Sequence, residues 1–317
     1  MGLPVPADLG LYVIWVNYGC GADIVRSRAS LVAQAATVPD LSLKFICVNN
    51  GPGDGRLETL IVEGMTVLEM GENAGFGRAC NRGIRWVADR DRAAAVWLLN
   101  PDTEVAAGCL AAIARTLVTD GQWRADWGIC GTTVITPTGE IWQTGGHWDR
   151  RTGSILPSRN RAPDPPNDPE RQPLRDTDWV SGCSLLLNLG HFRDAIPQFD
   201  PDFFLYYEDF DLCQRQRRAG HPIQWLPAAT VIHHPSSITG RTPHRRLRWS
   251  LYGYWLALEK HAPRSVLITR LLRTAIAIPI TALRDRSTAI AKATAIGDYW
   301  HHCLQKIFRP FLPKKFP

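Results

Sequence analysis

The sequence predicts an α/β fold with a mixed, mainly parallel central sheet and a helical C-terminal extension. In the first hundred residues, short apolar runs alternate with amphipathic stretches, as in strands joined by crossover helices. From Arg245 onward the pattern is helical, with mixed apolar and basic faces. Four strands are expected at residues 11–16, 43–48, 66–69 and 94–99, and two helices at residues 24–36 and 81–89.

The middle of the chain predicts shorter strands and a surface loop. Residues 128–153 are rich in Gly and Thr, which is typical of short strands and a hairpin. Residues 159–173 are dense in Pro, Asn, Asp and Arg and predict the loop. A helix is expected to end at Gly220, because glycine is common just after a helix C-terminus. That helix covers residues 208–219, and further strands are expected at residues 179–188 and 223–232.

Composition indicates a folded globular chain and leaves its ligands open. Its 317 residues suffice for one large domain or two modest ones, and 45% apolar with 21% charged residues exclude disorder of the whole chain. The net charge of +6 favours phosphorylated ligands, nucleic acid or an anionic membrane surface without choosing among them. The eight cysteines form no Cys-x-x-Cys pair and lie mostly in apolar runs, which predicts buried thiols in a reducing compartment.

Targeting signals point to a cytoplasmic protein that is able to touch a membrane. The N-terminus has no basic region followed by a long apolar core, so no signal peptide is evident. The segment 265–283 comes closest to a membrane-spanning length, but it carries Arg270 and Arg273. Arginines at 241, 245, 246 and 248 mix with Trp249, Tyr252, Tyr254 and Trp255, which predicts a basic aromatic patch for a membrane surface or a second subunit.

The strongest local motif is Leu98-Leu-Asn-Pro-Asp-Thr103. An apolar strand delivers the carboxylate of Asp102 at its carboxyl end, where ligands bind in parallel sheets. A divalent cation that bridges a diphosphate needs a hard oxygen ligand at such a rigid position. The alternative is a helix-capping or Asx turn, since proline and aspartate are common at helix starts.

A second motif, residues 203–215, places three carboxylates within four positions beside an aromatic run. Glu208 and Asp209 are expected at a helix start, where the helix dipole favours anions. A carboxylate there is suited to deprotonating an acceptor hydroxyl. Asp211 and Arg215 have the spacing of an ion pair along a helix. The alternative is simple helix capping by acidic residues.

Two further segments support a site near the strand ends. His233 and His234 follow a predicted strand and face a polar loop, which suits a metal ligand or a phosphate donor. In residues 71–83, glycines permit close approach of a ligand, and Asn73, Arg78 and Asn81 are able to bind phosphate or sugar oxygens. The segment is neither a P-loop nor a dinucleotide fingerprint, because its spacing fits neither.

Taken in chain order, these segments resemble family 2 glycosyltransferases, especially the bacterial rhamnosyltransferase-like group. The resemblance implies a GT-A fold at residues 1–240, with a nucleotide-binding half at residues 10–105 and an acceptor-binding half at residues 106–240. Residues 241–317 would form the helical extension. The matching stretches are residues 13–18, 48–55, 73–83, 98–103, 179–187, 199–220 and 227–237.

The resemblance also implies a metal site. Asn100-Pro-Asp102 occupies the place of the family's Asp-x-Asp motif, so Asp102 is expected to hold Mg²⁺ or Mn²⁺ on the donor diphosphate. Asn100 would then be a weaker or indirect ligand. His233 matches the histidine that completes the metal site in some relatives, and the adjacent His234 is its alternative.

Catalytic, donor and acceptor residues follow from the same resemblance. Asp209 matches the general base, with Glu208 as its catalytic neighbour. Asn49 stands where relatives usually have an aspartate that reads a pyrimidine base. The donor is expected to contact Asn17, Tyr18, Asn49, Asn73, Gly75, Phe76, Arg78, Asn81, Asn100 and Asp102. The acceptor is expected to contact Trp179, Gly182, Tyr207 and Asp211.

The function that this resemblance implies is inverting transfer of a sugar from a nucleotide diphosphate. Rhamnose from a dTDP donor is the first expectation, with a hexose from a UDP donor open. The acceptor is expected to be a polysaccharide or a lipid-linked glycan, the enzyme cytoplasmic or peripheral on the inner face of the cytoplasmic membrane, and a homo-oligomer is open. Nucleic acid is not expected, because no known binding module appears.

Two other functions compete with this one. A nucleotidyltransferase has a similar sheet and metal chemistry, but it requires a glycine-rich loop with signature Arg and Lys after the first strand. The chain has Asn17-Tyr-Gly-Cys-Gly21 there. A catalytically degenerate partner subunit that only binds nucleotide sugar is suggested by Asn49 and Asn100. The retention of Asp102, Asp209 and His233 favours the enzyme.

Overall fold

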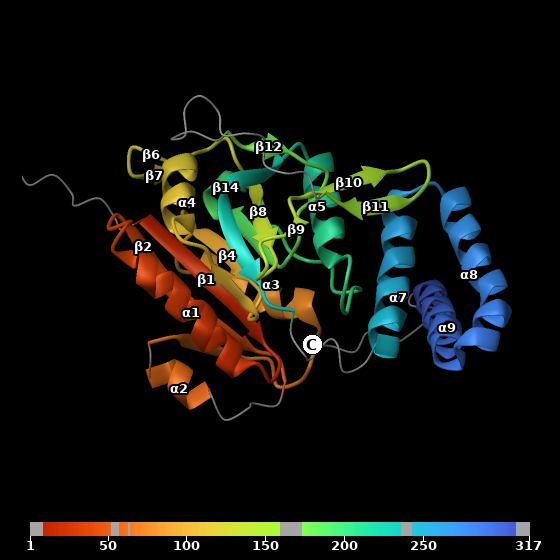
Figure 1. The fold of residues 1–317 in the computed structure, drawn as a ribbon. Coiled ribbons are helices and arrows are strands. Elements are labelled where there is room, and N and C mark those ends of the chain that lie inside the picture. The colour runs from red at the N-terminus through yellow and green to blue at the C-terminus, as the bar shows by residue number, and fades with distance from the viewer. Residues whose placement is uncertain (1–8, 52–56, 63, 159–172, 236–242, 309–317) are drawn as a thin grey trace, which may run out of the picture. The chain divides into compact units, whose positions relative to one another are not determined.

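The computed structural model describes residues 9–51, 57–62, 64–158, 173–235 and 243–308 (Figure 1). Its centre is a 10-stranded sheet with the order β12-β14-β8-β13-β4-β1-β2-β3, to which β5 and β9 are added at β14 and β8. The strands are β1 (Leu9–Asn17), β2 (Leu41–Asn49), β3 (Thr66–Glu69), β4 (Ala95–Leu99), β5 (Thr103–Val105), β8 (Ile129–Ile135), β9 (Ile141–Gln143), β12 (Arg175–Asp176), β13 (Ser184–Asn188) and β14 (Ile223–His233).

Most strands of this sheet run in one direction. β1 pairs in parallel with both β2 and β4, β2 with β3, and β14 with β8. β13 is antiparallel to β4 and β8, and β5 is antiparallel to β14. The carboxyl ends of β1, β2, β3, β4 and β14 therefore meet at one edge, together with the amino end of β13. The predicted mixed, mainly parallel sheet is confirmed.

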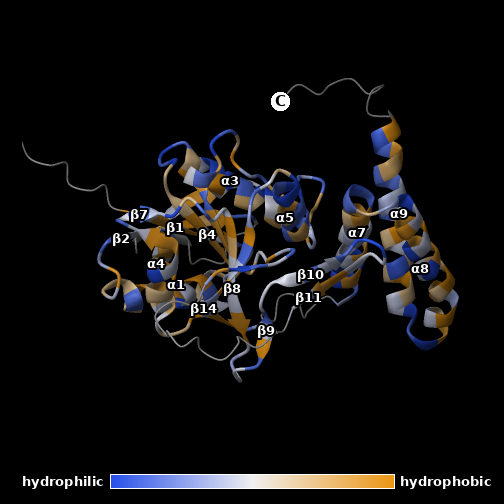
Figure 2. Cartoon of the chain, turned by 90° about the horizontal axis from the view of Figure 1, so that it is seen from above, coloured by the Kyte–Doolittle hydropathy of each residue, from blue (hydrophilic) through white to orange (hydrophobic). Residues whose placement is uncertain are grey.

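Helices cover both faces of the sheet, as Figures 1 and 2 show. Ile24 and Leu31 from α1 and Leu110 and Ile113 from α4 belong to the same buried core as Trp97 of β4. On the other face, Gly83 of α3 lies against the side chains of β1 and β2, close enough that a Cβ there would come within 2.9 Å of the Ile14 side chain. The helices of this half are α1 (Gly21–Ala35), α2 (Leu57–Val62), α3 (Phe76–Ala88), α4 (Cys109–Leu117) and α5 (Glu208–Arg218).

The remaining strands are short and the cysteines are unbridged. The hairpin predicted within residues 128–153 is formed by β8 and the antiparallel β9, while β10 pairs with β11 and β6 pairs with β7. None of the eight cysteines, all of which lie in the described ranges, forms a disulfide, and six are buried, as predicted. The short strands are β6 (Val118–Thr119), β7 (Gln122–Trp123), β10 (Gly146–Asp149) and β11 (Ser154–Pro157).

A second compact unit contains residues 149–153, 205–207 and 236–317. Its helices α7 (Pro243–His261), α8 (Arg264–Arg284) and α9 (Arg286–Phe308) pack against one another. Trp255 of α7 is fully buried and lies edge-on to Tyr299 of α9, with ring centroids 6.1 Å apart. Arg248 forms an ion pair with Asp298 across the same interface.

These contacts correct the predicted basic aromatic patch. Trp255 is part of the interface between α7 and α9 and is not at the surface, and Arg248 is bound to Asp298. Arg241 lies outside the described residues, as do residues 159–172 of the predicted surface loop. One described helix, α8, is long and apolar enough to cross a membrane by length and composition.

Several boundaries differ from the predicted ones. The strand expected at 179–188 forms only over Ser184–Asn188, and Trp179 makes an isolated bridge to Gly146 instead. α3 begins at Phe76, earlier than the predicted helix, because Gly75 adopts φ +88° and turns the chain into the helix. α4 was not predicted: it starts after Gly108, which is left-handed and provides no side-chain cap.

Candidate active site

The predicted metal pair meets at the carboxyl edge of the sheet. Asp102 follows β4, and His233 is the last residue of β14, whose partner across the ladder is Thr103. Asp102 Oδ1 and His233 Nε2 are 3.4 Å apart, and both side chains are largely buried. The backbone N–H of His234 donates to the Asp102 carbonyl at 2.8 Å, which holds the two segments together.

Of the two adjacent histidines, only His233 faces Asp102. Buried and partly exposed residues alternate toward the end of β14, and His233 is on the buried side. The His233 ring packs against the ring of Trp142, and the two ring centroids are 4.8 Å apart. Its Nδ1 is buried and has no hydrogen-bond partner within the described residues. His234 Nε2 instead lies 3.3 Å from Glu104 Oε1, and both of those side chains are exposed.

The Asp102 and His233 pair suits a cation that is shared with a ligand. A carboxylate oxygen and an imidazole nitrogen are both common ligands of divalent metals. No cluster of three or more His, Cys, Asp or Glu with metal-binding geometry occurs in the described part of the chain. A cation here would therefore complete its coordination with oxygens of a bound diphosphate and with water.

Asp209 lies in the first turn of α5 and is held by backbone donors. Its Oδ2 accepts a hydrogen bond from the N–H of Gly182 at 2.9 Å, and its Oδ1 accepts one from the N–H of Phe210 at 2.7 Å. Burial raises the pKa of Asp209, and these N–H donors oppose that rise. The side chain is half-buried, so the carboxylate is fixed in orientation and still reachable.

Glu208 points into the protein beside Asp209. Its side chain is buried, and Oε2 has no hydrogen-bond partner in the part of the chain that the structure describes. Burial, and next the charge of Asp209, raise the pKa of Glu208 to about 8. A proton shared by the pair is therefore favoured on Glu208, because both Asp209 oxygens already accept backbone N–H bonds. This arrangement favours Asp209 as the base and Glu208 as its positioning neighbour.

We expect Glu208→Gln to remove a pH dependence of stability. The pKa of Glu208 is about 8 in the folded protein, against an ordinary value of 4.5. Its contribution to the free energy of unfolding is therefore fully present below about pH 4.5 and is lost as the pH rises through 8. Urea unfolding from about pH 5 to about pH 8 should show the variant gaining stability over the parent protein. The exposed control Glu140→Gln should show no such gain, and a pH-independent difference for Glu208→Gln would contradict the assignment.

The turn before β13 contacts both Asp209 and the segment that leads to Asp102. Gly182 of this turn donates to Asp209, and the carbonyl of the next residue, Cys183, accepts the N–H of Asn100 at 2.9 Å. The pKa of the Cys183 thiol is raised by burial and then by the charges of Asp102 and Asp209. The two carboxylates thus approach the same turn, one from the end of β4 and one from α5.

On the donor side, three polar residues end three neighbouring strands. Asn17, Asn49 and Glu69 are in register across β1, β2 and β3. The amide of Asn17 donates to Asn49 Oδ1 at 3.2 Å, and the amide of Asn49 donates to Glu69 Oε2 at 2.8 Å. An aspartate at position 49 would face the Glu69 carboxylate, which explains why asparagine suits this chain. Tyr18 lies next to them, with its ring against Gly51 and 45% exposed.

The glycine-rich segment is held by its own side chains. Asn50 binds Asn73, the N–H of Ala74 and the carbonyl of Gly75. A Cβ on Gly75 would lie 2.4 Å from the Phe204 carbonyl oxygen, and the N–H of Phe76 donates to that same oxygen. Glycine is therefore required where this loop meets the segment that leads to Glu208.

Two residues that were predicted to bind the sugar donor form hydrogen bonds with the protein's own backbone instead. Arg78 donates to the carbonyl of Pro201, and Asn81 is buried with its amide bound to both the N–H and the carbonyl of Phe199. These bonds clamp the 199–201 segment to α3. A donor contact by either residue would require breaking them, so we assign both a structural role in this state.

The residues predicted to bind the acceptor lie in different surroundings. Gly182 adjoins Asp209, and a Cβ there would come within 3.0 Å of the Phe76 ring. Trp179 is mostly buried against Phe210. Asp211 has no exposed surface and pairs with Arg215 at 2.7 Å, which confirms the predicted ion pair and leaves Asp211 a structural role.

Tyr207 ends a strained turn in the second unit. It and Tyr206 both have left-handed backbone conformations, with φ of +67° and +72°, which bulky residues rarely adopt. The Tyr207 ring packs on Tyr254, and a Cβ on Gly253 would lie 2.4 Å from the Tyr206 carbonyl oxygen. The strained pair immediately precedes Glu208, which is consistent with strain concentrating at functional sites.

Comparison with known proteins shows what the chain is similar to. The Glycosyl transferase family 2 profile matches residues 12–123. The chain is 28% identical over 270 residues to N-acetylglucosaminyl-diphospho-decaprenol L-rhamnosyltransferase of Mycobacterium tuberculosis, which covers 75% of this chain and 80% of the relative. By this profile and this relative, the chain resembles family 2 glycosyltransferases of the rhamnosyltransferase-like group.

Solved structures of glycosyltransferases show that the chain has the GT-A fold. A mannosyltransferase from Pyrobaculum calidifontis, in complex with GDP-Man and Mn²⁺, superposes with a TM-score of 0.51 at 13% identity over 92% of this chain and 86% of its own. GalNAc-T7 with UDP, GalNAc and Mn²⁺ also superposes with a TM-score of 0.51 at 13% identity, over 79% of this chain. The chain spans about half, 48%, of the GalNAc-T7 chain.

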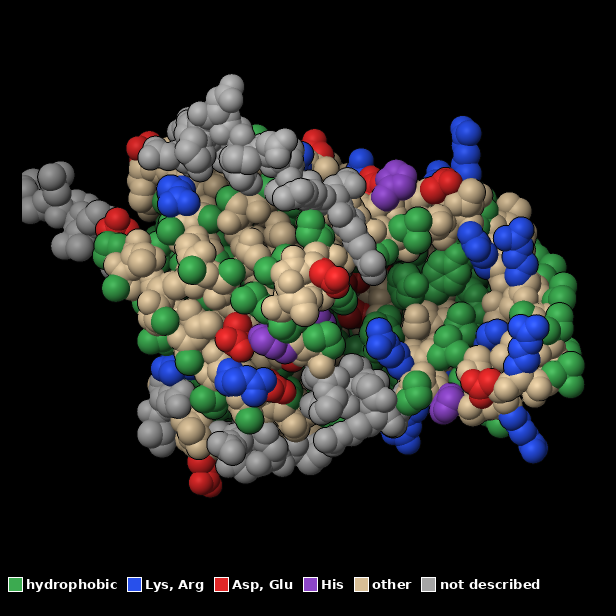
Figure 3. Space-filling view, viewed as in Figure 1, with side chains coloured by type: hydrophobic (Ala, Val, Ile, Leu, Met, Phe, Trp, Pro, Cys, Tyr) green, Lys and Arg blue, Asp and Glu red, His purple; other side chains and the backbone are tan. Residues whose placement is uncertain are grey.

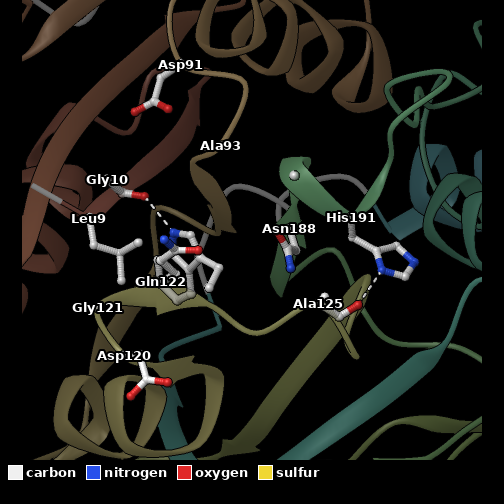
Figure 4. A pocket seen from close by; sticks show the side chains of 12 residues that line it. Leu9, Gly10, Asp91, Ala93, Asp120, Gly121, Gln122, Ala125, Asn188 and His191 are labelled. Carbon is white, nitrogen blue, oxygen red and sulfur yellow. Dashed lines mark hydrogen bonds between the residues drawn. The ribbon is translucent and has the colours of Figure 1, made fainter. Parts of the chain in front are cut away.

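Two cavities lie apart from the residues of the candidate site. One of about 490 Å³ opens at the amino end of β1, where Asp91, Asp120 and His191 line it (Figure 4). This is the opposite edge of the sheet from Asp102 and His233. Another, of about 420 Å³, is lined by polar groups that include Arg175 and Asp178.

Sequence analysis missed three contributors to the candidate site. Glu69 was seen only as a strand end, although it stands in register with Asn49. Trp142, which packs on His233, carried no motif signal. Cys183 lay inside a predicted strand, and only the structure shows that the chain turns there to contact both carboxylate segments.

Proposed function

We propose that the chain is an inverting, divalent-metal-dependent family 2 glycosyltransferase that transfers rhamnose, or another hexose, from a dTDP or UDP donor. The observation that carries the proposal is the turn at 181–183, which Asp209 and the Asp102 segment both contact. The name of the mycobacterial relative, a rhamnosyltransferase that acts on a diphospho-decaprenol, supports rhamnose as the first candidate and a diphosphopolyprenol-linked glycan as the acceptor. We place the enzyme in the cytoplasm or at the inner face of the membrane, where such acceptors occur.

The proposed chemistry is one displacement at the anomeric carbon. Asp209 accepts the proton of the acceptor hydroxyl while that oxygen forms its bond to the anomeric carbon. The bond from the anomeric carbon to the diphosphate oxygen breaks, and the nucleoside diphosphate leaves from the opposite face, which inverts the configuration. Asp102 and His233 would hold a Mg²⁺ or Mn²⁺ ion, which neutralises negative charge on the diphosphate when bound. Gly182 and Phe210 keep the Asp209 carboxylate oriented through their N–H groups.

Asn17, Tyr18 and Asn49 are our proposed nucleoside-binding group. They lie at the ends of β1 and β2, beyond which nucleotides bind in sheets of this kind. The exposed Tyr18 ring offers a stacking surface, and the amides of Asn17 and Asn49 are matched to each other and to Glu69. The Asn49 and Glu69 pair therefore presents a carboxylate and an amide to the base.

A donor screen by thermal shift tests the proposal. With Mn²⁺ or Mg²⁺ present, dTDP-rhamnose or a UDP-hexose should raise the melting temperature, because a ligand at about 100 times its Kd stabilises the fold by about 2.7 kcal/mol. Chelation of the metal should abolish the shift. No shift with either class of donor would contradict the proposal, and binding without any release of nucleotide diphosphate would favour a degenerate partner subunit.

A further inference from the structure

α8 carries a continuous stripe of exposed apolar side chains. Ile268, Leu272, Ile276, Ile280 and Leu283 are 54%, 56%, 70%, 60% and 89% exposed. Their spacing of four, four, four and three residues places them on one face of the helix. In Figure 3, hydrophobic side chains are visible on the surface of α8, which Figure 1 labels.

The composition of α8 differs from that of an ordinary surface helix. Its 21 residues contain an 18-residue window of mean hydropathy 1.7, of which only 6% is buried. Surface helices of soluble proteins normally turn such residues toward the core. An exposed apolar stripe of this length marks a contact surface for another apolar phase or partner.

The charges of α8 favour binding to an anionic surface. The helix contains four arginines and no aspartate or glutamate. At 100° per residue, Arg264 lies along one border of the stripe, and Arg273 and Arg284 lie along the other; all three are exposed. An apolar face bordered by arginines is the pattern of helices that lie in the headgroup region of anionic membranes.

Other contacts argue against α8 crossing the bilayer. The side opposite the stripe packs against α7 and α9. Arg270 on that side donates from Nε and Nη2 to the carbonyl of Thr152, at 3.1 and 2.6 Å. A spanning helix would have to give up these polar contacts or bury them in hydrocarbon, which is costly. On α9, Ile290, Trp300, Leu304 and Ile307 are also at least half exposed, and tryptophan is enriched at membrane interfaces.

We propose that α8 lies flat on an anionic lipid bilayer, with its apolar stripe inserted and its border arginines among the phosphate headgroups. The stripe supplies the insertion energy and the arginines supply the preference for negative charge. This surface is separate from the residues of the proposed transfer chemistry. It would hold the enzyme at the membrane whether or not a sugar donor is bound.

Vesicle co-sedimentation of the full chain tests this proposal. Vesicles of phosphatidylcholine with phosphatidylglycerol should bind the protein, vesicles of phosphatidylcholine alone should bind it at least about tenfold more weakly, and salt should weaken binding. The double variant Leu272→Glu/Ile276→Glu should lose at least about tenfold in affinity for anionic vesicles. The control Val32→Glu/Ile61→Glu changes two exposed apolar residues elsewhere and should bind like the parent protein.

The outcomes separate this proposal from its rivals. Equal binding of the parent protein and the α8 variant to anionic vesicles would overturn it. So would a lipid-free dimer that the α8 variant dissociates while vesicle binding stays unchanged, because the stripe would then be a contact between copies. The donor-induced thermal shift should be the same for the parent protein and the α8 variant, so failure of the membrane proposal is distinguishable from failure of the proposed enzyme activity.

Discussion

Replacing Asp209 with Asn should lower kcat for sugar transfer by about 10² to 10⁴-fold, the range that general-base catalysis contributes. The amide has no affinity for the proton of the acceptor hydroxyl, so the attacking oxygen would not be activated. Donor binding should change little, because none of the proposed metal and nucleoside residues is altered. The measurement is steady-state transfer to a polyprenol-linked or soluble glycan acceptor, alongside donor binding by calorimetry.

Stability must be followed in the same experiment. Asp209 accepts one N–H bond on each carboxylate oxygen, and Asn retains only one acceptor oxygen. The variant should therefore lose roughly 1–3 kcal/mol of folding stability. Asp23→Asn, an aspartate in the first turn of α1, is the matched control and should keep full activity. Retention of more than about a tenth of the activity by Asp209→Asn would move the base to another residue, given the range above.

Asp102→Asn and His233→Ala should each weaken metal-dependent donor binding by about 100-fold, or about 2.7 kcal/mol. Each change removes one of two protein ligands from a site that has no third protein ligand in the described ranges. Because the two residues act on one cation, the double variant should be little worse than either single variant. Donor titration by calorimetry with Mn²⁺, and again with a chelator, measures this.

The neighbouring histidine provides the control for this prediction. His234→Ala alters an exposed ring that faces Glu104 and should leave metal-dependent binding unchanged. In the presence of chelator, the parent protein should bind the donor as weakly as the Asp102→Asn variant. If either variant keeps the full response to Mn²⁺, the cation is held elsewhere.

The parallel half of the fold was predictable because its strands are buried on both faces. β1 and β4 appear in the sequence as unbroken apolar runs, which is characteristic of strands covered by helices on both sides. α4 was missed because its apolar, alanine-rich sequence starts after Gly108 with no capping side chain. The over-long strand at 179–188 shows the limit of pattern analysis, since hydrophobicity does not reveal that Gly182 leaves the sheet to bind Asp209.

The sequence predicted which residues belong to the site better than it predicted which residues they contact. Asp102 at a strand end and Asp209 at a helix start were evident from local sequence. The choice of His233 over His234 required the alternation of β14, which sets the inward face. The structural roles of Arg78 and Asn81 depend on the 199–201 segment, more than a hundred residues away, and no local pattern carries that information.

The reversed strand β13 brings a backbone N–H to the carboxyl edge of the sheet. Its neighbours β4 and β8 end at that edge, whereas β13 begins there. The turn that leads into β13 therefore lies among the ends of its neighbours, and Gly182 of this turn donates its N–H to Asp209. One strand of opposite direction thus places a hydrogen-bond donor for a carboxylate of α5 next to the strand end that leads to Asp102.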